Sequence, residues 1–318
     1  MKRKQIVGKS ISIQESFAQF QRFNQTKNLS PETIRYHDNH SKPFFAFLED
    51  VSQPVDSITK EKIDAYILHL KAKGTVNDTT INTRLRMVRG FLYYCMKRGL
   101  MPNFQIAQIR TTQPVKEPYT KAELALLLKK PNIKSCSFAR YRNWVIVNFL
   151  LATGCRASTL VNIRIEDIDL AGGMVLFRHM KTRTQQVVPL SKTIIGILEE
   201  YLAYRDGQPA EPLFISEYGN ALKVDTLDSC IREYNLSCGV EKTSLHLFRH
   251  TYAKLFITAG GDPFRLQKLL GHSDLTMTKR YVALYAEDLK ENYDKLNPLE
   301  QLSTGRNGNR VKLNVAHR

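Results

Sequence analysis

The sequence contains little cysteine, and what it has is not arranged in pairs. Five cysteines are scattered over 318 residues, and no Cys-x-x-Cys motif occurs. An odd number of thiols without a framework is typical of free cysteines in a reducing compartment. Cys155 stands beside an arginine, but we interpret it as a small packing residue.

Long apolar runs are also missing. No stretch is long enough to span a membrane, and the basic residues 1–4 are not followed by the apolar segment of a signal peptide. Together with the free thiols, this predicts a cytoplasmic protein that has no membrane partner. No Gly-x-x-x-x-Gly-Lys-Ser/Thr loop occurs, which argues against ATP use, and we expect no cofactor.

Acidic residues are scarce relative to basic ones. Lys and Arg number 47 against 30 Asp and Glu, which gives a net charge of +17 and a pI near 9.6. An excess of this size favours a polyanionic partner, and nucleic acid is the first candidate. A solvated basic surface or an anionic membrane is the alternative. The hydrophobic content of 42% is ordinary for a globular protein.

The periodicity predicts a mainly α-helical protein with a small antiparallel β-sheet. We expect a helical domain over residues 12–100, a proline-containing linker over 101–119 and a second domain over 120–298. Residues 299–318 form a basic tail whose composition favours disorder. Three short strands are expected in the second domain, at residues 163–168, 174–178 and 186–190.

The C-terminal third carries the most informative pattern. His246-x-x-Arg249 is followed by Gly271-His272 and then by Tyr281. A phosphodiester under attack needs a nucleophile, cationic donors on its non-bridging oxygens and groups that move protons. Tyrosine, arginine and histidine supply these parts, so the ordered set predicts an enzyme of DNA strand exchange. His246 and His250 stand four apart, like zinc ligands on a helix, but no third ligand is evident and we expect no metal.

Two further residues complete the set upstream. Arg156 follows a buried apolar helix that we expect to end at Gly154, and Lys181 lies at the tip of the second predicted hairpin. The chain thereby resembles the tyrosine recombinases, the family of phage integrases, chromosome-dimer recombinases and mobile-element integrases. The positions that match the family's order are Arg156, Lys181, His246, Arg249, His272 and Tyr281.

The resemblance implies an N-terminal core-binding domain and a C-terminal catalytic domain. It also implies a covalent 3′-phosphotyrosyl intermediate on Tyr281, double-stranded DNA with specific recombination sites as substrate, and a homo-tetramer in the synaptic complex. Accessory DNA-bending proteins are a further partner class that it suggests. One position departs from the pattern: Thr159 stands where the family usually has an acidic residue.

Two alternatives stay open. A type IB topoisomerase-like enzyme would use the same chemistry to relax DNA as a monomer, and a catalytically silent DNA-binding regulator would keep only the fold. The expected fourth helix carries Arg84, Arg86 and Arg89 among apolar residues. We interpret these as phosphate contacts, with a solvated helix surface as the alternative.

Overall fold

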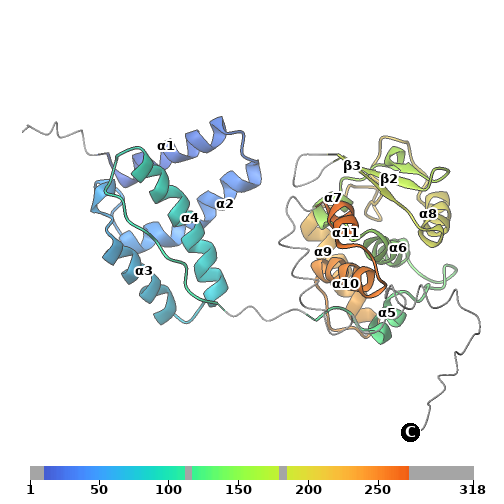
Figure 1. The fold of residues 1–318 in the computed structure, drawn as a ribbon. Coiled ribbons are helices and arrows are strands. Elements are labelled where there is room, and N and C mark those ends of the chain that lie inside the picture. Colours follow the sequence, from blue (N-terminus) through green and yellow to red (C-terminus); the bar gives the residue numbers. More distant parts are fainter. Residues whose placement is uncertain (1–10, 112–116, 179–184, 272–318) are drawn as a thin grey trace, which may run out of the picture. The chain divides into compact units, whose positions relative to one another are not determined.

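The computed structural model describes residues 11–111, 117–178 and 185–271. Within these ranges the chain is mainly helical and has one small antiparallel sheet, as the sequence predicts (Figure 1). The chain divides into two units, residues 1–115 and 116–318. No helix among the described residues is long and apolar enough to cross a membrane.

Capping side chains mark where the helices of the N-terminal unit begin. Its described helices are α1 (Ile13–Thr26), α2 (Pro31–Leu48), the short 3-10 helix η1 (Val55–Ser57), α3 (Lys60–Ala72) and α4 (Asp78–Lys97). Ser12, Ser30, Thr59 and Asn77 each accept a hydrogen bond from a backbone N–H of the first turn. Each cap satisfies a donor that the helix itself leaves unpaired. The helical character of the N-terminal domain, predicted from the sequence, is confirmed.

Helix α4 is the centre of this unit. It packs against α1, α2 and α3, and its Leu85, Val88 and Phe91 are completely buried. Aromatic rings fill the space around it: Phe17 meets Phe91 edge-on with ring centroids 5.4 Å apart. The core is therefore built from apolar and aromatic side chains, which need few polar partners.

The described start of the predicted linker packs on this same unit. Met101 and Ile106 are buried in its core. The Asn82 side chain both donates to the carbonyl of Ile109 (2.8 Å) and accepts from its N–H (3.0 Å). The Tyr93 hydroxyl accepts from the N–H of Ile106 (3.1 Å). Buried apolar side chains and hydrogen bonds from Asn82 and Tyr93 thus hold residues 101–109 against α4.

Helix α6 is the centre of the C-terminal unit and packs against α8, α9 and α10 (Figure 1). The described elements of this unit are α5 (Lys121–Leu127), α6 (Phe138–Thr153), α7 (Ala157–Leu160), the 3-10 helix η2 (Ile165–Asp167), β1 (Ile168–Asp169), β2 (Met174–Phe177), β3 (Gln186–Pro189), α8 (Lys192–Arg205), α9 (Val224–Ser237), α10 (Leu245–Thr258) and α11 (Pro263–Leu270). A capping box formed by Thr120 and Glu123 begins α5. Burial on nearly all sides of α6 explains its continuous apolar run.

The sheet has the strand order β1-β2-β3, and both pairs are antiparallel. The predicted second and third strands are confirmed, but the strand predicted over residues 163–168 is wrong for most of its length. The N–H of Arg164 donates to the Asp167 carboxylate at 2.9 Å, and Arg178 binds that same carboxylate. These contacts fold residues 165–167 into η2, so only Ile168–Asp169 pairs with β2.

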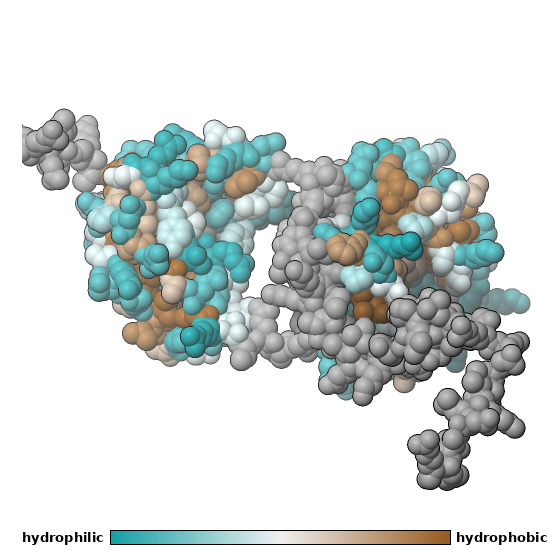
Figure 2. All heavy atoms as spheres, viewed as in Figure 1, coloured by the Kyte–Doolittle hydropathy of each residue, from teal (hydrophilic) through white to brown (hydrophobic). Residues whose placement is uncertain are grey.

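The visible surface of both units is mostly hydrophilic, with hydrophobic patches between the polar residues (Figure 2). Among the described residues the large apolar side chains with the greatest exposure include Leu68 on α3 and Phe264 on α11. Exposed apolar residues of this kind are ordinary on globular proteins.

Candidate active site

Arg156 is placed by the end of helix α6. The helix stops at Gly154, whose φ of 62° lies in the left-handed region. A Cβ on this residue would come within 2.5 Å of Tyr252 and 2.8 Å of Leu270, so both backbone angle and space require glycine. The chain then turns, and Arg156 becomes the residue before α7. The predicted glycine cap is confirmed.

His246 and Arg249 lie on the first turns of α10, three residues apart and therefore on adjoining positions of one face. His246 is exposed, whereas Arg249 is buried. The guanidinium donates from Nη1 to the carbonyl of Gly154 (2.9 Å) and from Nη2 to the carbonyl of Leu270 (2.8 Å). Arg249 thereby joins the carboxyl ends of α6 and α11.

The two helices that Arg249 joins both end at a glycine C-cap. Gly154 and Gly271 both adopt left-handed conformations, with φ of 62° and 59°. The last carbonyls of a helix have no intrahelical partner and carry partial negative charge, so a cationic donor stabilises them. Both of these acceptors are neutral carbonyls, and they orient the guanidinium. In the sequence, Arg156 stands two residues after the first glycine and His272 one residue after the second.

A second side chain binds the same end of α11. Gln186, the first residue of β3, donates from Nε2 to the carbonyl of Lys268 and to that of Leu269 (3.1 Å). Its Oε1 is buried and has no hydrogen-bond partner among the described residues. The carbonyls of residues 268, 269 and 270 therefore all accept side-chain hydrogen bonds, two from Gln186 and one from Arg249.

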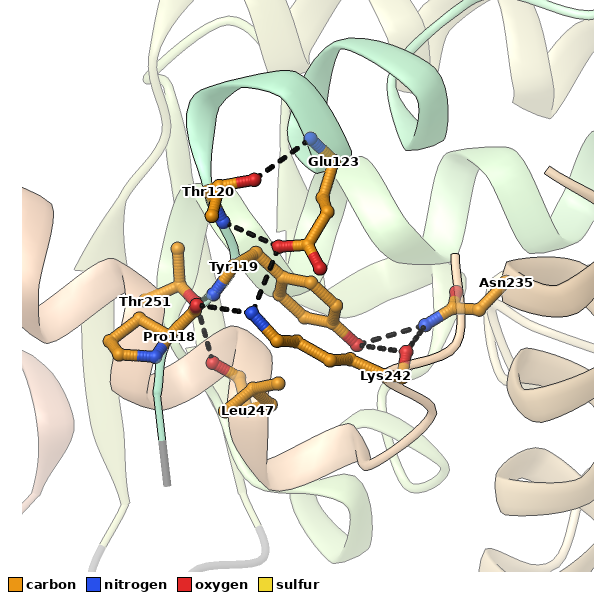
Figure 3. A network of polar contacts seen from close by, with 8 residues as sticks. All are labelled: Pro118, Tyr119, Thr120, Glu123, Asn235, Lys242, Leu247 and Thr251. Atoms are coloured by element: carbon orange, nitrogen blue, oxygen red, sulfur yellow. Dashed lines mark hydrogen bonds and ion pairs between the residues drawn. The ribbon is translucent and has the colours of Figure 1, made fainter. Parts of the chain in front are cut away.

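A polar network fixes the opposite flank of α10 (Figure 3). The N–H of Tyr119 donates to Thr251 Oγ1 (3.0 Å), which in turn donates to the carbonyl of Leu247 (2.8 Å). The Tyr119 hydroxyl accepts from Asn235 (2.8 Å) and donates to the carbonyl of Lys242 (3.0 Å). Burial raises the pKa of the Tyr119 phenol, so it keeps its proton and its donor role.

The lysine of this network reaches the start of the unit. Lys242 Nζ donates to the carbonyl of Pro118 (3.2 Å) and to the Glu123 carboxylate (3.1 Å). The same carboxylate accepts from the N–H of Thr120 at 2.7 Å (Figure 3). The residues at which the chain enters this unit are thus tied to the helix that carries His246 and Arg249.

Thr159 and Cys155 flank Arg156. Thr159 is buried, and its N–H donates to the carbonyl of Arg156 at 3.0 Å. Burial raises the pKa of the Cys155 thiol to about 11, although the charge of Arg249 opposes the shift. The thiol is therefore protonated at neutral pH, and Cys155 belongs to the hydrophobic core, as expected for a packing residue.

The structure brings part of the predicted set together. Arg249 binds the turn that leads to Arg156, and His246 stands on the same helix as Arg249. Lys181, His272 and Tyr281 lie outside the described residues. The sequence analysis missed Gln186, Thr251 and the Tyr119 network, since a lone polar residue in a strand or helix carries no motif that would mark it.

The three arginines of α4 do not share one face. Positions 84 and 86 are separated by roughly 160° around a helix of 3.6 residues per turn. Arg86 is exposed, whereas Arg84 and Arg89 are half-buried. The Arg89 guanidinium lies over the Tyr93 ring, 5.6 Å from its centroid, and lines a groove of about 770 Å³ between α3, α4 and residues 105–109. The three side chains point in different directions because offsets of two and three residues spread side chains around a helix, and their role as phosphate contacts stays a prediction.

Two family profiles cover most of the chain. The Phage integrase family matches residues 119–288, and the phage integrase N-terminal SAM-like domain matches residues 17–99. The chain belongs to the phage integrase family. It is an enzyme of the tyrosine recombinase type, whose family activity is site-specific DNA recombination.

Curated relatives are similar over nearly the whole length of this recombinase. A tyrosine recombinase XerC of Pelobacter propionicus is 29% identical over 283 residues, which covers 86% of this chain and 91% of the relative. A tyrosine recombinase XerD of Staphylococcus epidermidis is 24% identical over 282 residues, covering 86% and 94%.

Solved structures share the fold of this recombinase. The Tn1549 transposon integrase in complex with transposon right end DNA matches with a TM-score of 0.67 at 20% identity, covering 85% of this chain and 94% of that one. A lambda integrase tetramer bound to a Holliday junction matches with a TM-score of 0.67 at 15% identity, covering 88% and 81%. At these identities the likeness supports the fold: a helical N-terminal domain followed by a tyrosine recombinase catalytic domain.

Proposed function

We propose that this recombinase cuts and rejoins double-stranded DNA at specific sites through a covalent 3′-phosphotyrosyl intermediate on Tyr281. The phenol oxygen attacks the scissile phosphorus, the bond to the 5′-oxygen breaks, and that oxygen leaves as a protonated hydroxyl. The phosphodiester is conserved in the covalent bond, so rejoining by the reverse attack needs no ATP. No cofactor enters the scheme.

The remaining residues of the set have separate roles in this proposal. Arg156 and Arg249 bind the non-bridging oxygens, because guanidinium stays charged and donates in a planar fork. Lys181 is the general acid for the leaving 5′-oxygen. His246 accepts the proton of the tyrosine, and His272 donates to the phosphate.

The observation that carries the proposal is the junction made by Arg249. Its guanidinium binds the carbonyls of Gly154 and Leu270, at the ends of two helices. These ends immediately precede Arg156 and His272 in the sequence. A guanidinium held at the ends of two helices, which lead in the sequence to Arg156 and His272, suits an anionic, phosphate-like substrate.

The partners follow from the same reaction. We propose that the protein acts as a homo-tetramer on two paired duplexes, since exchanging strands between duplexes requires four cleavages. The Tn1549 integrase neighbour, described with transposon right end DNA, supports a mobile-element substrate. Accessory DNA-bending proteins would help to bring the duplexes together.

Capture of the covalent intermediate tests the proposal. The protein is incubated with a library of nicked duplexes that lose their 5′-fragment on cleavage, so that rejoining is blocked. Denaturation and sequencing then recover DNA bound to protein, and peptide mapping locates the link. We expect a 3′-phosphate on Tyr281, formed without metal or nucleotide.

The matched control is Tyr281→Phe, which should bind DNA with unchanged affinity and yield no adduct. A link that maps to Tyr285, Tyr293 or a serine would contradict the assignment of the nucleophile. An equal yield of adduct from both proteins would contradict covalent catalysis by Tyr281.

A further inference from the structure

Side chains from two other elements donate hydrogen bonds to the carboxyl end of helix α11. The helix spans only Pro263–Leu270, and its last carbonyls accept hydrogen bonds both from the capping N–H of Gly271 and from side chains of other elements. Gln186 donates to two of its last carbonyls and Arg249 donates to a third. The carbonyl of Lys268 also accepts from the N–H of Gly271 at 3.0 Å, whereas carbonyls of the last turn in general depend on donors from outside the helix. Side chains from β3 and α10 therefore hold the last turn of α11.

Gln186 is itself held rigidly by the sheet. It pairs with Phe177 in the β2–β3 ladder, and Phe177 is buried in the core. The backbone position of Gln186 is thus set by main-chain pairing and by burial of its neighbour across the ladder. Its amide can then act as a fixed donor to α11.

We propose that Gln186 is a positioning residue of the recombinase, which holds the carboxyl end of α11 so that the chain enters His272 in a productive geometry. The inference rests on the proposed function, because it assigns Gln186 to the reaction through His272. Gln186 touches the backbone of Lys268 and Leu269 and acts through them. Arg249 binds the next carbonyl, so displacement of α11 also disturbs the guanidinium.

The chemistry of the contact predicts which side chains can replace Gln186. The carbonyl oxygens need a donor, so the amide nitrogen is required and the amide oxygen is not. Lysine supplies an N–H donor with a positive charge, which a helix carboxyl end favours. Methionine has a similar length without a donor, and glutamate places a negative charge against two carbonyl oxygens. The expected order of function is Gln and Lys first, then Met, then Glu.

The test compares Gln186→Lys, Gln186→Met and Gln186→Glu for the single-turnover rate of adduct formation on the duplex recovered by the capture experiment. We expect Gln186→Met and Gln186→Glu to slow adduct formation by about 10- to 100-fold, because misplacing catalytic groups by about 1 Å can have an effect of this size. Gln186→Lys should stay near the wild-type rate. DNA affinity and the unfolding midpoint should change little. Hydrogen exchange of the peptide over residues 263–271 should rise in Met and Glu only.

Gln208 provides matched controls, since it is exposed and lies outside the strands and helices. Gln208→Lys and Gln208→Glu carry the same charge changes and should leave the rate unchanged. Three results would overturn the inference: equal rates for all Gln186 variants, a Lys variant as slow as Met, or faster hydrogen exchange without slower cleavage. Failure of the proposed function is a separate result, because then the wild-type protein itself forms no adduct on Tyr281.

Discussion

The two units of this recombinase differ in the charge of the polar side chains that they bury. The buried polar residues of the N-terminal unit are uncharged, namely Ser16, Asn24 and Ser41 among the described residues. In the C-terminal unit the buried polar residues include four charged ones: Arg142, Asp167, Arg205 and Arg249. Several of these bind backbone carbonyls, as Arg142 does with Ile215 at 2.8 Å.

The difference follows from which groups each unit must keep in a fixed position. An apolar core with aromatic rings is sufficient to keep helices together, and cations can then remain near the surface as Arg86 does. A catalytic site needs charged groups in fixed directions, and buried hydrogen bonds provide direction that apolar contacts lack. The cost is that each such polar group must keep its partner. Substitutions at matched positions in the two units measure this difference.

The largest difference in unfolding free energy is expected between alanine substitutions at two glycines of positive φ, one in each unit. Gly154→Ala forces a Cβ into Tyr252 and Leu270 at a φ of +62°, whereas Gly74→Ala at a φ of +63° meets nothing within 4 Å. We expect Gly154→Ala to lower the free energy of unfolding by about 2–5 kcal/mol, from backbone strain plus overpacking. Gly74→Ala should lower it by about 1–2 kcal/mol, from strain alone.

The single tryptophan allows unfolding of the C-terminal unit to be measured separately from unfolding of the N-terminal unit. Trp144 is buried on α6, so its fluorescence reports unfolding of the C-terminal unit, while circular dichroism reports helices of both. Gly154→Ala should shift the fluorescence midpoint and Gly74→Ala should not. Equal losses for the two variants would show that the space around Gly154 can relax.

A smaller difference in unfolding free energy is expected between valine substitutions at two threonines whose hydroxyls donate to a carbonyl of their own helix. Thr251 is buried and also accepts from the N–H of Tyr119, whereas Thr83 bonds the carbonyl of Thr79 at the surface of α4. Thr251→Val leaves a buried N–H without its acceptor and should cost about 1–3 kcal/mol in denaturant unfolding. Thr83→Val should stay within about 0.5 kcal/mol. A neutral Thr251→Val would mean that the Tyr119 network does not stabilise α10.

The smallest effect is expected from a surface arginine. If Arg86 contacts a phosphate, Arg86→Gln should reduce the slope of log affinity against log salt by about 0.9 and leave stability unchanged. Arg142→Gln, at a buried position, should lower stability and leave the slope unchanged. Binding isotherms over a salt series, with melting curves for both variants, measure the two quantities. An unchanged slope for Arg86→Gln would remove this residue from the DNA contacts.

Much of the fold could be predicted because its signals are local. Serine, threonine and asparagine caps locate helix starts, and the glycine at position 154 locates the end of α6. The capping box at Thr120 is likewise a local signal, because its partner Glu123 is three residues away. The first strand was predicted wrongly because Asp167 binds Arg178 and the N–H of Arg164. That arrangement depends on residues that local periodicity does not connect.

The sequence by itself determined the family, the order of the candidate catalytic residues and the position of the cap before Arg156, because each is encoded within a short segment. Only the tertiary structure decided that Arg249 lies between the ends of α6 and α11, since its partners Gly154 and Leu270 are 95 and 21 residues away. It also decided that Gln186 binds the end of α11, through partners that are 82 and 83 residues away. The physical reason is that a carbonyl at a helix end accepts any donor that the fold brings to it, and the sequence does not specify which donor that is.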